Sequence, residues 1–121
     1  MTTASATLLR APSSAGVARR LVDRHGAGLT AERREDIGLM VSELVTNALR
    51  HGQGTVTVRI VAGPNALTVE VADEGHGTVD ITPAPGAAGG WGLRIVDELA
   101  DGWGSAVGST RVWFRVLLDR S

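Results

Sequence analysis

The hydrophobic residues between positions 30 and 52 recur every three or four residues, which is the spacing of one face of an α-helix. The apolar positions are Ile37, Met40, Val41, Leu44, Val45 and Ala48. Thr30 precedes them as an N-cap, and the acidic residues that follow it suit the positive end of the helix dipole. The pattern predicts a long helix that begins after Thr30, buries one stripe and ends at Gly52 and Gly54.

Two shorter segments also have helical spacing. Ser13 or Ser14 can cap a helix that runs through Leu21 and Val22 and ends near residues 26–28, where two glycines occur. Residues 92–100 repeat apolar side chains with the same period, directly after a segment rich in glycine, alanine and proline. We therefore expect three helices, with a loop before the third.

The other segments alternate between apolar and polar residues, which is typical of half-buried strands. They cover residues 6–10, 55–61, 67–71, 103–107 and 111–118. The order is strand, helix, helix, strand, strand, loop, helix, strand, strand. This order favours an α+β fold, a two-layer α/β sandwich with a mixed, mostly antiparallel sheet and helices on one face. A chain of 121 residues has the size of one domain, so we expect a single domain over residues 1–121.

Composition excludes several functions. The formal net charge of −1 argues against direct binding of nucleic acid or of an acidic membrane. The absence of cysteine excludes thiolate nucleophiles and Cys-based zinc sites. The chain also has no lysine, so it has neither a Walker A phosphate loop nor the strand lysine of a eukaryotic-type protein kinase.

The chain has no run of about 18 apolar residues, the length that a membrane-spanning helix needs. Its first ten residues lack the charged and apolar blocks of a signal peptide. We therefore expect a cytoplasmic protein.

Glu43 and Asn47 lie four residues apart in the predicted long helix, so their side chains share one face. Such a pair alone is more often a solvated polar edge. In a functional site, the Asn oxygen suits Mg²⁺, and the Glu carboxylate can orient or deprotonate an attacking oxygen.

Two glycine-containing segments follow. Asp73, Gly75 and Gly77 come directly after a strand, where glycines allow close approach of a ligand and a carboxylate can accept a hydrogen bond from an amine. Gly90 and Gly92 lead into the third helix, whose free N–H groups and dipole favour phosphate. Taken singly, the first segment is also typical of a plain turn, and the second of a hinge.

The three segments together, in this order, resemble the N box and the two glycine boxes of the GHKL ATPase superfamily. The resemblance runs from about Thr30 to the C-terminus and implies a Bergerat-type sandwich that binds ATP with Mg²⁺. Residues 42–51 are most similar to the anti-sigma-factor serine-protein kinases. Their sequence is Ser-Glu-Leu-Val-Thr-Asn-Ala-Leu-Arg-His. Residues 92–104, Gly-Leu-Arg-Ile-Val-Asp-Glu-Leu-Ala-Asp-Gly-Trp-Gly, point to the same branch.

The resemblance implies a role for each motif residue on the helix and after the strand. Asn47 would ligate Mg²⁺, and Glu43 would be the general base. His51, one turn after Asn47, could face the phosphates or simply end the helix. Asp73 would accept a hydrogen bond from the adenine amine, and Gly77 would line the base pocket.

Further roles are implied by the glycine boxes and by the C-terminal segment. Gly75 and Leu93 belong to these boxes and are also assigned to nucleotide binding. Gly90 and Gly92 would meet the phosphates. Thr110, in a segment similar to the last box of the superfamily, would support Asp73 through water.

The chain departs from the family pattern in its lid, residues 78–89, which is short and has no basic residue. Neutralisation of the phosphates would then fall to Mg²⁺, to backbone N–H groups and to Arg50 or Arg94.

The resemblance implies a serine-protein kinase that phosphorylates a small anti-sigma antagonist protein, binds a sigma factor in turn and forms a homodimer. The alternative is an ATP-gated protein-binding switch that transfers no phosphate. The ATP-binding half of a sensor histidine kinase is disfavoured, because no helical segment with a phosphoacceptor histidine precedes the domain. A topoisomerase or a chaperone is disfavoured because their downstream domains are missing.

Overall fold

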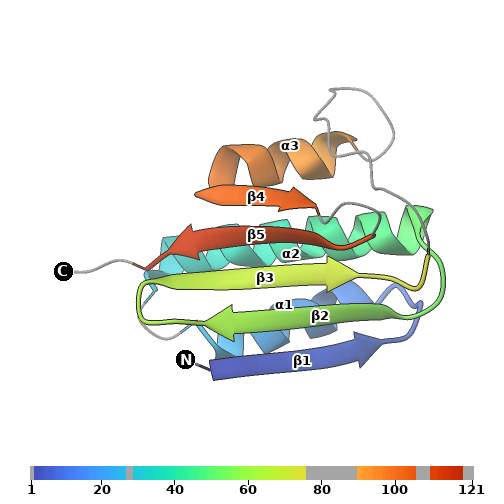
Figure 1. The fold of residues 1–121 in the computed structure, drawn as a ribbon, viewed down its shortest axis with the longest axis horizontal. Helices are drawn as coiled ribbons and strands as arrows, with labels where there is room; N and C mark the ends of the chain where they lie inside the picture. Colours follow the sequence, from blue (N-terminus) through green and yellow to red (C-terminus); the bar gives the residue numbers. More distant parts are fainter. Residues whose placement is uncertain (1, 27–28, 76–89, 106–109, 119–121) are drawn as a thin grey trace.

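The computed structural model describes residues 2–26, 29–75, 90–105 and 110–118 as one layer of helices packed on one sheet. The elements follow in the order β1 (Thr2–Leu8), α1 (Ser14–Arg24), α2 (Ala31–His51), β2 (Val56–Ala62), β3 (Ala66–Ala72), α3 (Gly90–Leu99), β4 (Gly102–Ser105) and β5 (Val112–Leu117). In Figure 1, α1 and α2 lie behind the sheet, and α3 runs alongside β4. The predicted α+β sandwich is confirmed.

The sheet has the strand order β1-β2-β3-β5-β4. All four described strand pairings are antiparallel. The sequence predicts a mixed, mostly antiparallel sheet, and the described strands include no parallel pair. The pairing of β3 with β5 joins strands that α3 and β4 separate in the sequence. This crossover brings residues near 73 and 110 to the same end of the sheet.

Strand β1 is the element whose predicted position is wrong. The sequence predicts it over residues 6–10, whereas all of Thr2–Leu8 pairs with β2. Its inward positions include two alanines, and only Leu8 is a large buried side chain, so the hydrophobic signal in the sequence is weak. Leu9 is exposed and leaves the strand.

The core lies between α2 and the inner face of the sheet, where the alternating residues of three strands meet the apolar stripe of the helix. From the strands these are Val56, Val58, Ile60, Leu67, Val69, Val71, Val112, Phe114 and Val116, and from α2 they are Ile37, Met40, Val41, Leu44 and Val45. Both predicted periodicities are therefore confirmed. Burial of this surface fixes the register of each strand, since a slip by one residue would turn the apolar set outward.

Caps define the starts of the first two helices. Thr30 Oγ1 accepts a hydrogen bond from Arg33 N at 3.1 Å, as the predicted N-cap of α2 should. Ser13 occupies the N-cap position of α1 without a side-chain hydrogen bond. Ser14 Oγ instead donates to Leu9 O at 2.5 Å, which ties the start of α1 to the end of β1.

Helix α3 packs against α2, and polar contacts fix its C-terminal end. Arg33 of α2 donates to Leu99 O at 2.9 Å and to Asp101 Oδ2 at 2.8 Å. The same Asp101 oxygen accepts from Leu117 N of β5 at 2.7 Å. Arg33 and Asp101 therefore link α2, α3 and the sheet at the end of α3 that is farther from its glycines.

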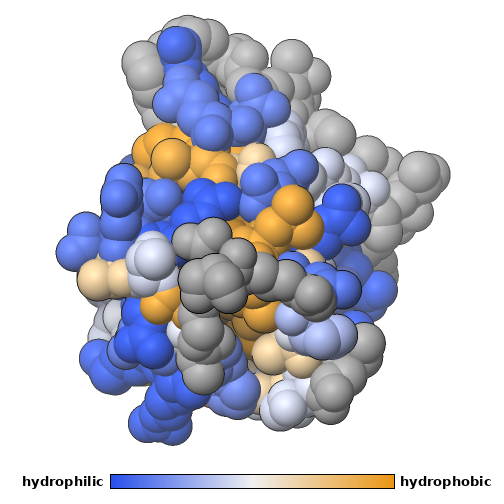
Figure 2. Space-filling view, turned by 90° about the vertical axis from the view of Figure 1, so that its left-hand side faces the viewer, coloured by the Kyte–Doolittle hydropathy of each residue, from blue (hydrophilic) through white to orange (hydrophobic). Residues whose placement is uncertain are grey.

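Polar residues cover most of the face drawn in Figure 2, with small groups of apolar residues among them. No described helix combines the length and apolarity that a membrane span requires.

We predict that Phe114→Ala lowers the free energy of unfolding by about 3–5 kcal/mol, because it removes a fully buried ring from the centre of β5. The matched control on the same strand is Leu117→Ala, whose side chain is 55% exposed and which should cost less than about 1 kcal/mol. Urea denaturation measures both. Equal losses would contradict the position assigned to the core.

Candidate functional site

The candidate site forms where β3, β5 and the end of α2 meet. Asp73 directly follows β3, and Thr110 lies two residues before β5. The pairing of Val71 with Val112 in these neighbouring strands brings the two residues together although 37 positions separate them.

Thr110 contacts the backbone of Asp73 directly. Asp73 N donates to Thr110 Oγ1 at 3.3 Å, and this hydroxyl donates to Asp73 O at 3.1 Å. The resemblance implies support of Asp73 by Thr110 through water, whereas the described contact is a direct one to the main chain. Thr110 thus holds the backbone at the end of β3.

The two oxygens of the Asp73 carboxylate differ in their contacts to the described residues. Oδ1 accepts hydrogen bonds from Gly75 N at 2.6 Å and from Gln53 N at 3.3 Å. Among the described residues, none donates a hydrogen bond to Oδ2. Two backbone donors therefore fix the direction of the carboxylate and leave one oxygen for another donor.

Glycines 52 and 75 make room for this carboxylate. A Cβ on Gly52 would lie 2.2 Å from Asp73 Oδ2 and 2.6 Å from Ala48 O. A Cβ on Gly75 would lie 2.7 Å from Asp73 Oδ1. Gly75 belongs to the predicted site, whereas the sequence indicates Gly52 only as the end of a helix.

A second acidic side chain joins the same two loops. Glu74 N donates to Gln53 O at 2.8 Å, and Glu74 Oε2 accepts from Thr55 N at 2.8 Å. The segment after α2 and the segment after β3 are therefore connected by side-chain and backbone hydrogen bonds. Gln53 and Glu74 are not predicted from the sequence, since nothing in their spacing indicates that the two loops meet.

The predicted residues of α2 lie on the C-terminal half of this helix, which ends at the Asp73 loop. Glu43 and Asn47 are half-buried, and His51 in the last turn is exposed. Gly52 N closes the helix by donating to Ala48 O at 2.9 Å. The structure thus places the N-box helix next to the carboxylate that the resemblance assigns to adenine.

The predicted residues of α3 are less closely tied to this loop. Gly90 and Gly92 lie in the first turn of α3, where backbone N–H groups lack helical acceptors. Leu93 is 5% exposed and packs in the hydrophobic core, so its described contacts are structural. Gly77 and the lid segment 78–89 lie outside the described residues.

No group of three or more His, Asp or Glu side chains is arranged to hold a metal ion within the described ranges.

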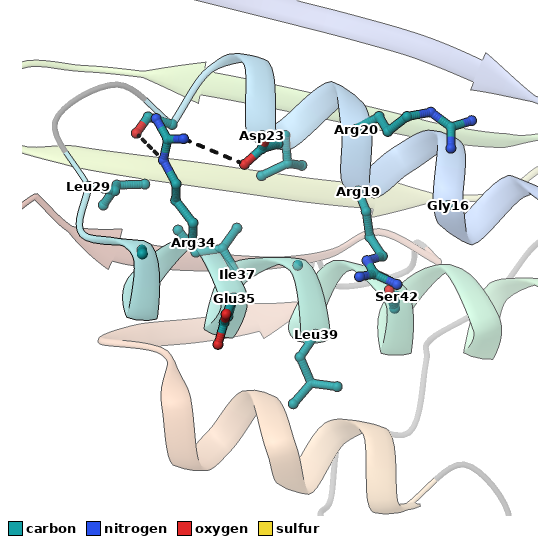
Figure 3. A pocket seen from close by; sticks show the side chains of 14 residues that line it. Gly16, Arg19, Arg20, Asp23, Leu29, Arg34, Glu35, Ile37, Leu39 and Ser42 are labelled. Atoms are coloured by element: carbon teal, nitrogen blue, oxygen red, sulfur yellow. Dashed lines mark hydrogen bonds and ion pairs between the residues drawn. The ribbon is translucent and has the colours of Figure 1, made fainter.

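A cavity of about 730 Å³ lies elsewhere, between α1 and α2 (Figure 3). Its polar lining includes Arg19, Arg20, Asp23, Arg34, Glu35 and Ser42. None of the predicted site residues lines this cavity. This cavity is therefore separate from the place where hydrogen bonds join Asp73, Gly75 and Thr110.

A model of the histidine kinase-like ATPase domain family matches residues 5–116. The anti-sigma F factor of Thermoanaerobacter sp. (strain X514) is 41% identical over 73 residues, which is 55% of this chain and 51% of that protein. The anti-sigma F factor of Clostridium acetobutylicum is 44% identical over 59 residues, covering 46% of this chain and 41% of that protein.

A protein of another type is also similar. The blue-light-activated histidine kinase 2 of Erythrobacter litoralis (strain HTCC2594) is 40% identical over 81 residues, or 62% of this chain and 23% of that protein. The chain spans about half the length of the anti-sigma F factors that it matches and less of the histidine kinase.

We predict that Gly52→Ala lowers the free energy of unfolding by about 1–3 kcal/mol, because the new methyl group overlaps Asp73 Oδ2 and Ala48 O. The control is Gly63→Ala, where the new Cβ would meet only Ala66 O at 3.5 Å. That change should shift stability by less than about 1 kcal/mol. Thermal or urea unfolding measures both, and a neutral Gly52→Ala would show that the Asp73 loop is not packed as described.

Proposed function

The chain belongs to the histidine kinase-like ATPase domain family, and from this premise we propose that it binds Mg-ATP and acts as a regulatory serine-protein kinase. Its substrate would be a serine of a small antagonist protein, and it would bind a sigma factor when it does not bind the antagonist. The similarity to anti-sigma F factors supports this choice within the family.

The observation that carries the proposal is the state of the Asp73 carboxylate. Oδ1 is held by the N–H groups of Gly75 and Gln53, and Oδ2 has no donor among the described residues. An adenine amine can donate to this oxygen, whereas the guanine carbonyl at the equivalent position would face it as a second acceptor. Gly52 and Gly75 allow the carboxylate to take this position, since a Cβ on either residue would lie within 3 Å of one of its oxygens.

The phosphates would lie toward the residues that favour negative charge. The first turn of α3, with Gly90 and Gly92, offers backbone N–H groups and the positive end of a helix dipole. Asn47 would hold the magnesium ion through its side-chain oxygen. Bound magnesium would neutralise part of the phosphate charge. This contribution matters because the lid, residues 78–89, has no basic residue.

Glu43 is proposed as the general base. It lies one helical turn before Asn47 on α2, so both side chains face the same side of the helix. Glu43 would accept the proton of the partner's serine hydroxyl. The serine oxygen would bond to the γ-phosphorus of ATP as the bond between that phosphorus and the leaving ADP oxygen breaks. The half-buried position of Glu43 limits competition from bulk water.

The alternative is an ATP-gated switch, in which nucleotide binding changes partner choice and no phosphate is transferred. Both functions use the same Asp73 and Asn47 contacts and differ only in the role of Glu43. The homodimer and the cytoplasmic location stay predictions from the family resemblance and the sequence.

We predict that Asp73→Asn weakens ATP binding by about 1–3 kcal/mol, the cost of losing a charge-assisted hydrogen bond in a partly buried site. The wild-type protein should bind ATP in a magnesium-dependent manner and bind GTP weakly. Asp23→Asn, an exposed carboxylate of α1 that lines the other cavity, is the control and should leave ATP affinity unchanged. Calorimetry measures all three proteins, and equal affinity for ATP and GTP would refute the role of Asp73.

We further predict that Glu43→Gln changes ATP affinity little and lowers phosphotransfer by about 10²–10⁴-fold, the usual contribution of a general base. Asn47→Ala should lose the magnesium dependence of ATP binding and all subsequent steps. Glu35→Gln, an exposed change on the same helix, is the control and should alter neither property.

The measurement pairs calorimetry with label transfer from γ-labelled ATP to the partner protein. A wild-type protein that binds ATP but labels no confirmed partner would reject the kinase and favour the switch.

A further inference from the structure

Arg10 connects the N-terminal part of the chain to the candidate site. It lies two residues beyond β1, and its guanidinium reaches the C-terminal end of α2. One nitrogen, Nη1, donates to Ala48 O at 3.2 Å and to Gly54 O at 3.3 Å. The other, Nη2, donates to Leu49 O. A single side chain therefore binds three backbone carbonyls that are 38–44 residues away in the sequence.

Leu49 O is one of the carbonyls that a helix C-terminus leaves without an intrahelical partner, whereas Ala48 O also accepts from the C-cap Gly52 N and Gly54 O belongs to the loop that follows. A cation at this position also complements the negative end of the helix dipole. The turn that it binds lies between Asn47 and His51, and Gly52 N donates to Ala48 O, which also accepts from Arg10. Arg10 thus restrains the part of α2 that carries the proposed magnesium ligand.

The restraint extends to the carboxylate of Asp73. The loop that Arg10 binds at Gly54 contains Gln53, whose N–H donates to Asp73 Oδ1. Gln53 O accepts from Glu74 N, and Thr55 N donates to Glu74 Oε2. Within residues 52–55, Gly54 therefore contacts Arg10, and its neighbours Gln53 and Thr55 contact the segment after β3.

We infer that Arg10 is a positioning residue for the nucleotide site. It holds the end of α2 and the following loop where Gln53 N can donate to Asp73 Oδ1. This inference rests on the proposed binding of ATP. The planar guanidinium has donors in several fixed directions and can bind three carbonyls at once, which a lysine ammonium on a flexible chain does less well. Arg10 contributes through the backbone that it fixes and does not itself touch the nucleotide.

The test compares Arg10→Ala and Arg10→Lys with wild type, with Arg20→Ala as a control that removes an exposed arginine of α1. Calorimetry with Mg-ATP is done at a temperature at which every variant is folded. Arg10→Ala should raise the dissociation constant for ATP about two- to fivefold, the range expected for an exposed helix-end cation. Arg10→Lys should restore part of the affinity, and Arg20→Ala should match wild type.

Amide hydrogen exchange without nucleotide gives a second, independent readout. Arg10→Ala should speed exchange at Gln53, Thr55 and Gly75 and leave α3 unchanged. A lower melting temperature with unchanged ATP affinity and unchanged exchange at these amides would reduce Arg10 to a structural residue and overturn the inference. An equal loss of affinity in Arg20→Ala would also overturn it, because the effect would then be one of overall charge.

The two proposals fail in different ways. A wild-type protein that binds no ATP would reject the proposed function, and with it the role of Arg10 in nucleotide binding, whatever the exchange data show. A wild-type protein that binds ATP, with Arg10→Ala equal to it in both measurements, would reject the inference alone.

Discussion

The two hydrogen bonds that Asp73 Oδ1 accepts, from Gly75 N and from Gln53 N, are the contacts on which the candidate site depends. Gly75 N is in the same loop as Asp73, so that bond fixes the carboxylate relative to its own backbone. Gln53 N comes from the end of α2, so this bond fixes it relative to the helix that carries Glu43 and Asn47. The carboxylate is directed by the fold before any ligand arrives, which lowers the cost of ordering it on binding.

The fold supplies this arrangement through its core. The apolar stripe of α2 packs on β2 and β3 in a core that also includes β5, so the end of the helix and the ends of the strands cannot move independently. The antiparallel pairing of β3 with β5 sets Thr110 beside Asp73. Arg10, from the segment that follows β1, binds the end of α2. The first turn of α3 contains Gly90 and Gly92. Arg33 and Asp101 fix the C-terminal end of this helix.

The sequence predicted the elements well where a periodic apolar pattern determines them. Helix α2 and strands β2, β3 and β5 agree to within about two residues, because their inward positions are large and apolar. Strand β1 was misplaced because small residues carry little hydrophobic signal. The spacing of Glu43 and Asn47 and the position of Asp73 after a strand indicate candidate residues, and the family resemblance adds Thr110. The structure brings Asp73 and Thr110 into contact at the end of the sheet that adjoins the end of α2. Gly52, Gln53, Glu74 and Arg10 could not be predicted, since their roles depend on contacts between loops that no local pattern encodes.

The role of Asp73 can be tested by a crystal structure of the protein with magnesium and a non-hydrolysable ATP analogue. The adenine amino nitrogen should lie within hydrogen-bonding distance of Asp73 Oδ2, with Oδ1 still bound to the N–H groups of Gly75 and Gln53. Nucleotide bound instead in the cavity between α1 and α2, or an Asp73 carboxylate turned away from the base, would contradict it.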